Sequence, residues 1–177
     1  MFSKSKLAVM TSAAVLSLAA FGAQAAATDD GVVHFTGEVV NTPCNVATTS
    51  LDQTVKFGKL PAATIAAGTA IAPVAFKLDL ANCSVDSLTN KTVQVTFDGA
   101  SIPGADTELQ TTGGTGVAIT VSPVGGSDVT FGTADAALPV VDGSNSLAYQ
   151  AVVKKATGGT IVPGEFTAVT NFTLAYQ

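Results

Sequence analysis

The sequence predicts an all-β fold, a sandwich of short strands, on three observations. Several short segments alternate apolar and polar residues with a period of two, as strands with one buried face do. Glycine and proline dipeptides that favour tight turns separate these segments. The Ala-rich stretch 60–71 is compatible with a helical turn, but Pro61, Gly68 and Pro73 oppose a long helix. Many short strands with frequent turns favour a β-sandwich.

The expected strands follow one another along the chain with short gaps. The first spans Val32–Val40 and the second spans Thr54–Phe57. Alternation is clearest in Val74–Leu80 and Thr92–Phe97, where every second residue is Val, Leu or Phe. The later expected strands are Gly116–Val121, Asp128–Phe131, Leu138–Val141, Ser146–Lys154 and Glu165–Tyr176. No linker divides them, so they form a single domain.

Residues 1–25 are interpreted as a secretory signal peptide outside the fold. Two lysines precede a 15-residue apolar run, Leu7–Phe21, and Ala23-Gln24-Ala25 fits the small-x-small cleavage pattern. A transmembrane anchor is the alternative, but the run is shorter than the about 20 residues of a bilayer span. The mature chain would then start at Ala26, contain 177 − 25 = 152 residues, and be exported.

Composition excludes several classes of function. The chain has no Arg and only 8 Lys against 13 acidic residues, so a nucleic-acid surface is not expected. His34 is the single His, which excludes histidine-rich metal sites, and no metal or other cofactor is expected. Asp106 and Glu108 are interpreted as solvated loop acids rather than a hydrolytic pair. No enzyme class is indicated.

The two cysteines, Cys44 and Cys83, are expected to form a structural disulfide. Export places them in an oxidising compartment, where two cysteines most simply pair with each other. Neither cysteine lies in a C-x-x-C motif, so the case for a redox role is weak. No nearby ligands suggest a zinc site.

Both ends of the mature chain alternate unusually far. At the C-terminal end the apolar residues share one side up to the penultimate position, which indicates a strand built to be buried. The last three of these residues are Phe172, Leu174 and Tyr176. At the N-terminal end Gly31, Val33 and Phe35 share one side, and Gly37 then interrupts the pattern. This segment is either the first strand of the sandwich or a separate strand that leaves the domain.

With these residues in view, the chain resembles subunits of chaperone–usher fimbriae, and it is similar to type 1 fimbrial major subunits. The matching features are GVVHFTGEVVNTPC, which ends at Cys44, then LDQTVKFGKL, and FKLDLANC, which ends at Cys83. The end of the chain also matches, with Gly164 fourteenth from the end and a penultimate Tyr176.

The resemblance implies an incomplete immunoglobulin-like β-sandwich that lacks its last strand. Residues 26–36 would be an N-terminal donor-strand extension, and 37–177 the pilin domain. Gly31, Val33 and Phe35 would enter a neighbouring subunit. The chaperone or subunit interface would comprise Gly164, Phe172, Leu174 and Tyr176.

The resemblance also implies the partners and the place of action. They are a periplasmic chaperone, an outer-membrane usher, copies of the chain itself and other pilus subunits. The expected function is that of a structural subunit of a surface fimbria, exported through the periplasm and polymerised by donor-strand exchange into the shaft. The alternative is a minor or tip-associated subunit, or a small adhesin.

Overall fold

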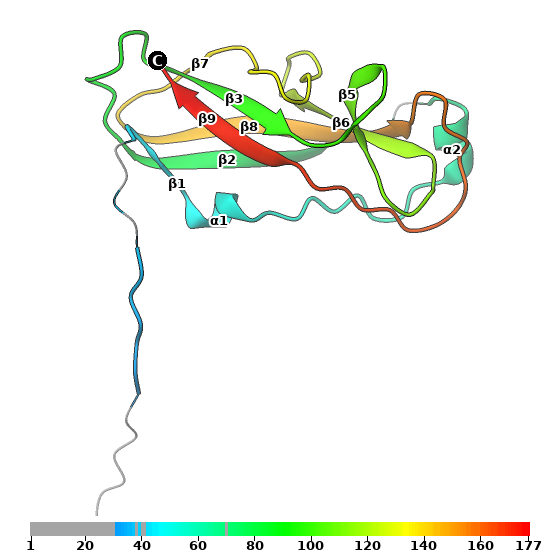
Figure 1. Cartoon of the computed structure of the whole chain (residues 1–177), viewed down its shortest axis with the longest axis horizontal. Coiled ribbons are helices and arrows are strands. Elements are labelled where there is room, and N and C mark those ends of the chain that lie inside the picture. The colour runs from blue at the N-terminus through cyan, green and yellow to red at the C-terminus, as the bar shows by residue number, and fades with distance from the viewer. Residues whose placement is uncertain (1–30, 38, 40–41, 70) are drawn as a thin grey trace, which may run out of the picture. The chain divides into compact units, whose positions relative to one another are not determined.

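The computed structural model describes residues 31–37, 39, 42–69 and 71–177 (Figure 1). The chain divides into two units, Met1–Val39 and Val40–Gln177. The expected signal peptide, residues 1–25, and residues 26–30 of the expected extension lie outside the described residues. All the described helices and strands belong to the second unit.

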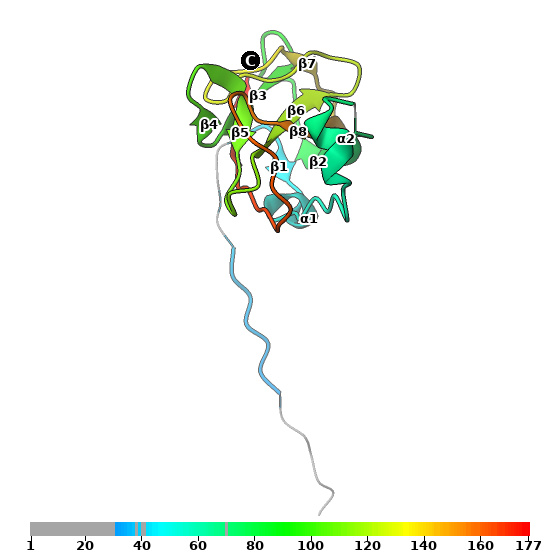
Figure 2. The same ribbon diagram turned by 90° about the vertical axis from the view of Figure 1, so that its right-hand side faces the viewer.

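The second unit is built from two antiparallel sheets, as the sequence predicts (Figures 1 and 2). The six-stranded sheet has the order β1 (Asn45–Val46), β2 (Val74–Cys83), β8 (Gly143–Lys155), β6 (Val117–Pro123), β5 (Ala105–Gln110) and β4 (Ser101–Ile102). The three-stranded sheet has the order β7 (Leu138–Pro139), β3 (Thr92–Asp98) and β9 (Asn171–Tyr176). Two short helices are α1 (Thr48–Leu51) and α2 (Ala62–Ala66).

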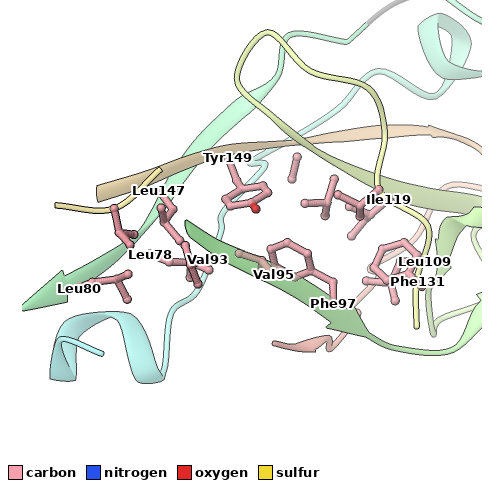
Figure 3. Close-up of a cluster of buried hydrophobic side chains, with 14 of the residues drawn as sticks. Leu78, Leu80, Val93, Val95, Phe97, Leu109, Ile119, Phe131, Leu147 and Tyr149 are labelled. Carbon is pink, nitrogen blue, oxygen red and sulfur yellow. The ribbon is translucent and has the colours of Figure 1, made fainter. Parts of the chain in front are cut away.

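The core lies between the two sheets (Figure 3). Leu78 and Leu80 on β2 are buried, while Lys77 before them is exposed and Asp79 between them is only half-buried, so the alternation in the sequence marks the buried face. Tyr149 of β8 is fully buried, and its ring packs edge-on against Phe97 of β3 with ring centroids 5.0 Å apart. The predicted strands around β2, β3, β6 and β8 are therefore confirmed, with small changes at their ends.

Several predicted strands are wrong because burial is not the same as pairing. Residues 128–131 form no strand, although Val129 and Phe131 are buried. Their N–H groups donate single hydrogen bonds to carbonyls of two different segments, at Val121 (2.8 Å) and Asp106 (2.9 Å), so no ladder forms. The strand expected at 138–141 is reduced to β7.

Three further segments expected as strands lack regular secondary structure. In the expected first strand, Val32–Val40, the described residues 32–37 and 39 form no strand, and neither do residues 54–57. The last strand begins only at Asn171 instead of Glu165. Residues 165–170 are held by a loop instead: Thr112 N–H donates to the Thr167 carbonyl at 2.8 Å. A Cβ at Gly113, where φ is +91°, would collide with the Glu165 carbonyl.

The expectation of solvated loop acids is wrong for Glu108, which lies on β5 and is 4% exposed. Its carboxylate accepts hydrogen bonds from Thr157 N–H (2.7 Å) and the Thr157 hydroxyl (2.8 Å), and pairs with Lys154 Nζ at 2.9 Å. Burial opposes ionisation, but the Thr157 hydrogen bonds and Lys154 outweigh it and lower the pKa of Glu108. Asp106 is exposed, as expected.

Within the part of the chain that the structure describes, no helix is long and apolar enough to cross a membrane. The same residues contain no group of three or more His, Cys, Asp and Glu side chains placed to hold a metal ion.

We expect Glu108→Gln to lower the free energy of unfolding by about 1–3 kcal/mol at neutral pH, because hydrogen bonds to a charged acceptor are lost. Because the pKa of Glu108 is lowered in the folded state, the carboxylate stabilises the fold fully at a pH above its pKa in the unfolded chain, which is about 4.3. This stabilisation is lost as the pH falls through the lower pKa of the folded state. The difference from wild type should therefore shrink in acid, as measured by urea unfolding at several pH values.

Asp106→Asn is the matched control, because it removes an exposed charge two positions away on β5. If Glu108→Gln were as stable as Asp106→Asn at neutral pH, the structural role assigned to the buried carboxylate would be wrong.

Candidate functional site

Strand β9 lies at the edge of the three-stranded sheet and is hydrogen-bonded on one side. Its register with β3 runs from Asp98 opposite Asn171 to Val93 opposite Tyr176. Along the described residues no strand pairs with its other side. The free N–H and C=O groups of such an edge are a template for a further strand.

The inward-facing side chains of β9 are only half covered. They are Phe172, Leu174 and Tyr176, which we call the acceptor strip. Their cross-strand partners on β3 are Phe97, Val95 and Val93, of which none is more than 2% exposed. Opposed residues of an antiparallel pair point to the same face, so both rows face the core. The lower burial of the β9 side chains therefore shows that no further strand covers them on the open side of β9.

A second unpaired backbone flanks the same core. Residues 54–60, between α1 and α2, carry no backbone–backbone hydrogen bond to any other residue that the structure describes. Val55 and Phe57 are half-buried and pack against the core. The Phe57 ring lies 6.2 Å from that of Phe166, five positions before β9, so the two segments meet at this end. The alternating pattern at 54–57 correctly indicates that Val55 and Phe57 face the core. Only the fold shows that the backbone of this segment forms no hydrogen bonds with another described strand.

The acceptor strip ends in an unpartnered hydroxyl. The Oη atom of Tyr176 is buried and has no hydrogen-bond partner among the described residues. Burial raises the pKa of Tyr176, so the group is a neutral O–H able to donate. A buried hydroxyl without a partner costs about 1–3 kcal/mol, which makes this end of the strip incomplete.

The described part of the N-terminal unit exposes an alternating apolar segment. Val33 is 72% exposed and Phe35 is 90% exposed, and the segment forms no strand. Gly31 shares their parity in the sequence, while His34 stands on the other parity and is also exposed. Large apolar side chains exposed in a row mark an interaction surface.

Cys44 and Cys83 form a disulfide, the pairing that the sequence predicts, with Cα atoms 4.0 Å apart. Both residues are buried, at 3% and 6% exposure. The bond joins the chain just before β1 to the end of β2, where Ser84 N–H also donates to the Pro43 carbonyl at 2.8 Å. The disulfide thus holds the start of the second unit on the six-stranded sheet.

Gly164 is separate from the acceptor strip, seven positions before β9, and is exposed. A Cβ on it would lie 3.2 Å from Thr115 Cγ2, which is tighter than an ordinary contact. Of the four predicted interface residues, the structure groups three on β9. At Gly164 the close approach of Thr115 gives a local packing reason for a residue without a side chain.

Comparisons with known proteins agree with this geometry. The family model described as "Fimbrial protein" matches residues 33–177. The chain is 36% identical over 181 residues to the Pap fimbrial major pilin protein of Escherichia coli, covering 96% of this chain and 98% of that protein. It is 38% identical over 158 residues to the Fimbria A protein of Serratia marcescens, covering 88% and 89% of the two chains.

Solved structures show the same fold. A subunit from the structure of a chaperone–usher pilus, described for its rod uncoiling, superposes with a TM-score of 0.80 at 37% identity, covering 88% of this chain and 100% of that chain. The crystal structure of the P pilus rod subunit PapA gives a TM-score of 0.72 at 37% identity, covering 77% and 100%.

We expect Leu174→Ala to lower the free energy of unfolding of the subunit by only about 1–2 kcal/mol, since the Leu174 side chain is only half-buried, against about 2–5 kcal/mol for a fully buried leucine. Leu78→Ala, at a β2 residue that is 2% exposed, supplies the comparison, and Thr173→Ala on the exposed side of β9 is the control. Urea unfolding measures all three. Equal losses for Leu174→Ala and Leu78→Ala would show that the strip is already covered.

We expect the Cys44→Ser/Cys83→Ser variant to unfold more readily, because the disulfide closes a loop with a sequence separation of 39 residues. In the chain-entropy model a loop of this size contributes about 4 kcal/mol. Alkylation without reductant, followed by mass spectrometry, should find no free thiol in the wild-type protein. Labelled Cys44 or Cys83 in the unreduced protein would contradict the pairing.

Proposed function

Because the chain belongs to the fimbrial protein family of chaperone–usher pilus subunits, we propose that it forms the shaft of a surface fimbria by head-to-tail donor-strand exchange. The observation that carries the mechanism is the half-covered acceptor strip on the open edge of β9. The similarity to a major pilin and to a rod subunit supports the shaft over other positions in the fibre.

In the proposed contact, the N-terminal extension of one copy, residues 26–36, supplies the strand that the next copy lacks. Gly31, Val33 and Phe35 face the acceptor strip, and the donor backbone bonds to the open edge of β9. Burial of Val33 and Phe35 contributes about 1.5–3 kcal/mol each. Each backbone hydrogen bond adds about 0.5–1.5 kcal/mol net. The sum gives a contact that dissociates very slowly.

Each copy carries one donor segment and one acceptor strip, which belong to different segments of the chain. Such a heterologous contact repeats without closing and builds a filament. The proposed pilin domain is residues 37–177. The separation of the chain into units at Val39 and Val40 supports a boundary near this position.

A free acceptor strip is an aggregation hazard, so it needs cover before assembly. We assign this cover to a periplasmic chaperone that lends a strand to β9, followed by transfer of the subunit at an outer-membrane usher. Residues 1–25 act as the signal peptide that directs export to the periplasm.

A minor or tip-associated subunit, or a small adhesin, is the second candidate. A donor segment and an acceptor strip in the same chain favour an internal position in the fibre. No catalytic role is proposed, since the buried acid Glu108 is bonded to Thr157 and Lys154.

Deletion of residues 26–36 should leave a folded subunit that no longer polymerises, because the extension contributes to the neighbour and not to its own domain. Electron microscopy of cells that express the deletion variant should show no fibres, while pull-down with the chaperone still recovers the subunit. Fibres of normal length from the deletion variant would contradict donor-strand exchange.

A matched pair of point variants tests the same contact by parity. Phe35→Asp places a charge on the side that enters the neighbour, and His34→Asp places it on the side that does not. We expect Phe35→Asp to abolish fibres and His34→Asp to retain them. Equal effects of the two substitutions would argue against a strand inserted with this face.

A further inference from the structure

The segment that leads from β8 into β9, residues 156–170, has no regular secondary structure. The loop of residues 111–116, between β5 and β6, bonds to it along most of its length. Three backbone hydrogen bonds join the two, from Thr112 N–H to the Thr167 carbonyl (2.8 Å), from Val162 N–H to the Thr115 carbonyl (3.1 Å) and from Ala156 N–H to the Gly116 carbonyl (3.0 Å). This loop therefore determines where the segment lies.

Two glycines of the loop allow the two backbones to touch. Gly113 has a φ of +91° and Gly116 a φ of +71°. A Cβ at Gly113 would collide with the carbonyl of Glu165, and a Cβ at Gly116 would collide with that of Thr160. Gly114, with a φ of +68°, has no atom of another described segment within 4 Å of such a Cβ. Positive φ favours glycine at all three positions, but only Gly113 and Gly116 also need it for contact. We call these two contacts the glycine clasp.

The glycine clasp fixes the backbone of Phe166. A Cβ at Gly113 would lie 3.4 Å from the Phe166 Cα atom, so the loop contacts the residue directly. Phe166 shares the parity of the acceptor strip, is half-buried, and packs against the core. It thus extends the half-covered apolar row to a point five positions before β9.

Phe166 in turn contacts the unpaired segment 54–60. The ring of Phe57 lies 6.2 Å from the ring of Phe166. Because this segment has no backbone hydrogen bond to another described residue, side-chain packing of Val55, Phe57 and Leu60 holds it. A series of contacts therefore runs from Gly113 through Phe166 to Phe57. Without such support, half-covered apolar side chains favour collapse onto one another, because collapse removes apolar surface from water.

We propose that the glycine clasp, acting through Phe166 and Phe57, holds segment 54–60 in a fixed position relative to the acceptor strip and so keeps the strip open for the donor strand. This inference rests on the proposed donor-strand exchange. Gly113 is a positioning residue, since it acts through Phe166. A surface already held in its binding shape loses less free energy to ordering when its partner arrives. Loosening the clasp should therefore slow capture of the donor strand.

The test measures the rate at which the full-length subunit, held by its chaperone, captures an excess of a synthetic peptide of residues 26–36. Native electrophoresis separates the chaperone complex from the peptide complex. Gly113→Ala is the test variant and Gly114→Ala is the matched control, because both place a Cβ at a positive φ but only the first meets another backbone. We expect Gly113→Ala to capture the peptide about tenfold more slowly than Gly114→Ala does.

A double-mutant cycle with Phe166→Ala distinguishes positioning from a general loss of stability. If Gly113 acts through Phe166, Phe166→Ala alone should slow capture, and adding Gly113→Ala should slow it no further. Val169→Ala is the control in the same segment, since Val169 is 80% exposed. Equal capture rates for Gly113→Ala and Gly114→Ala, or additive effects of Gly113→Ala and Phe166→Ala, would overturn the inference.

A milder variant decides the question if the Gly113→Ala subunit does not accumulate. Thr112→Val removes the hydroxyl that lies 2.7 Å from the Thr167 hydroxyl, and it leaves the backbone bond between these residues in place. We expect it to slow capture about two- to tenfold, the effect of one hydrogen bond. Thr133→Val, at an exposed threonine outside the clasp, should have no effect. Equal rates for these two variants would overturn the inference.

Failure of the proposed function gives a different result from failure of the clasp. If donor-strand exchange is wrong, the wild-type subunit captures no peptide and fibres persist without residues 26–36, and the clasp inference falls with it. If only the clasp is wrong, the wild-type subunit captures the peptide and Gly113→Ala captures it as fast as Gly114→Ala.

Discussion

The constraint on which this structure depends is the missing cover beside β9. Three residues of β3 are almost fully buried, yet the three residues of β9 that face the same core are only half-buried. The second unit therefore holds a core that it cannot close with its own strands. The free edge of β9 and the unpaired backbone of residues 54–60 have the same cause, a strand position that is left empty.

Away from β9, the central strands of the six-stranded sheet are paired on both sides. The six-stranded sheet has a continuous ladder through β2, β8 and β6, and every residue of β6 from Val117 to Ser122 is buried. The disulfide holds the start of the unit on β2, and Glu108 bonds β5 to the chain after β8. A subunit whose edge strand β9 carries half-buried apolar side chains suits repeated assembly, because each added strand meets the same surface.

The sequence predicts the strands whose two neighbours are both present. Alternation in Val74–Leu80 and Thr92–Phe97 reports the buried faces of β2 and β3, and paired cysteines follow from export. Alternation misleads at 54–57, since side chains there are half-buried without backbone pairing. Apolar alternation also gives no signal for β5, because one of its buried residues is the charged Glu108. The partners of Glu108, Thr157 and Lys154, lie far away in the chain.

By itself the sequence determined the fold class, the disulfide pair, and the two alternating segments at the ends of the mature chain. It could not decide whether those segments pair within one chain, because a period of two reports which side chains seek burial and not what buries them. Only the tertiary structure decided that β9 has one partner and leaves Phe172, Leu174 and Tyr176 half open. It alone decided that the Tyr176 hydroxyl has no partner within the described part of the chain, because hydrogen bonding depends on which atoms of distant segments meet in space.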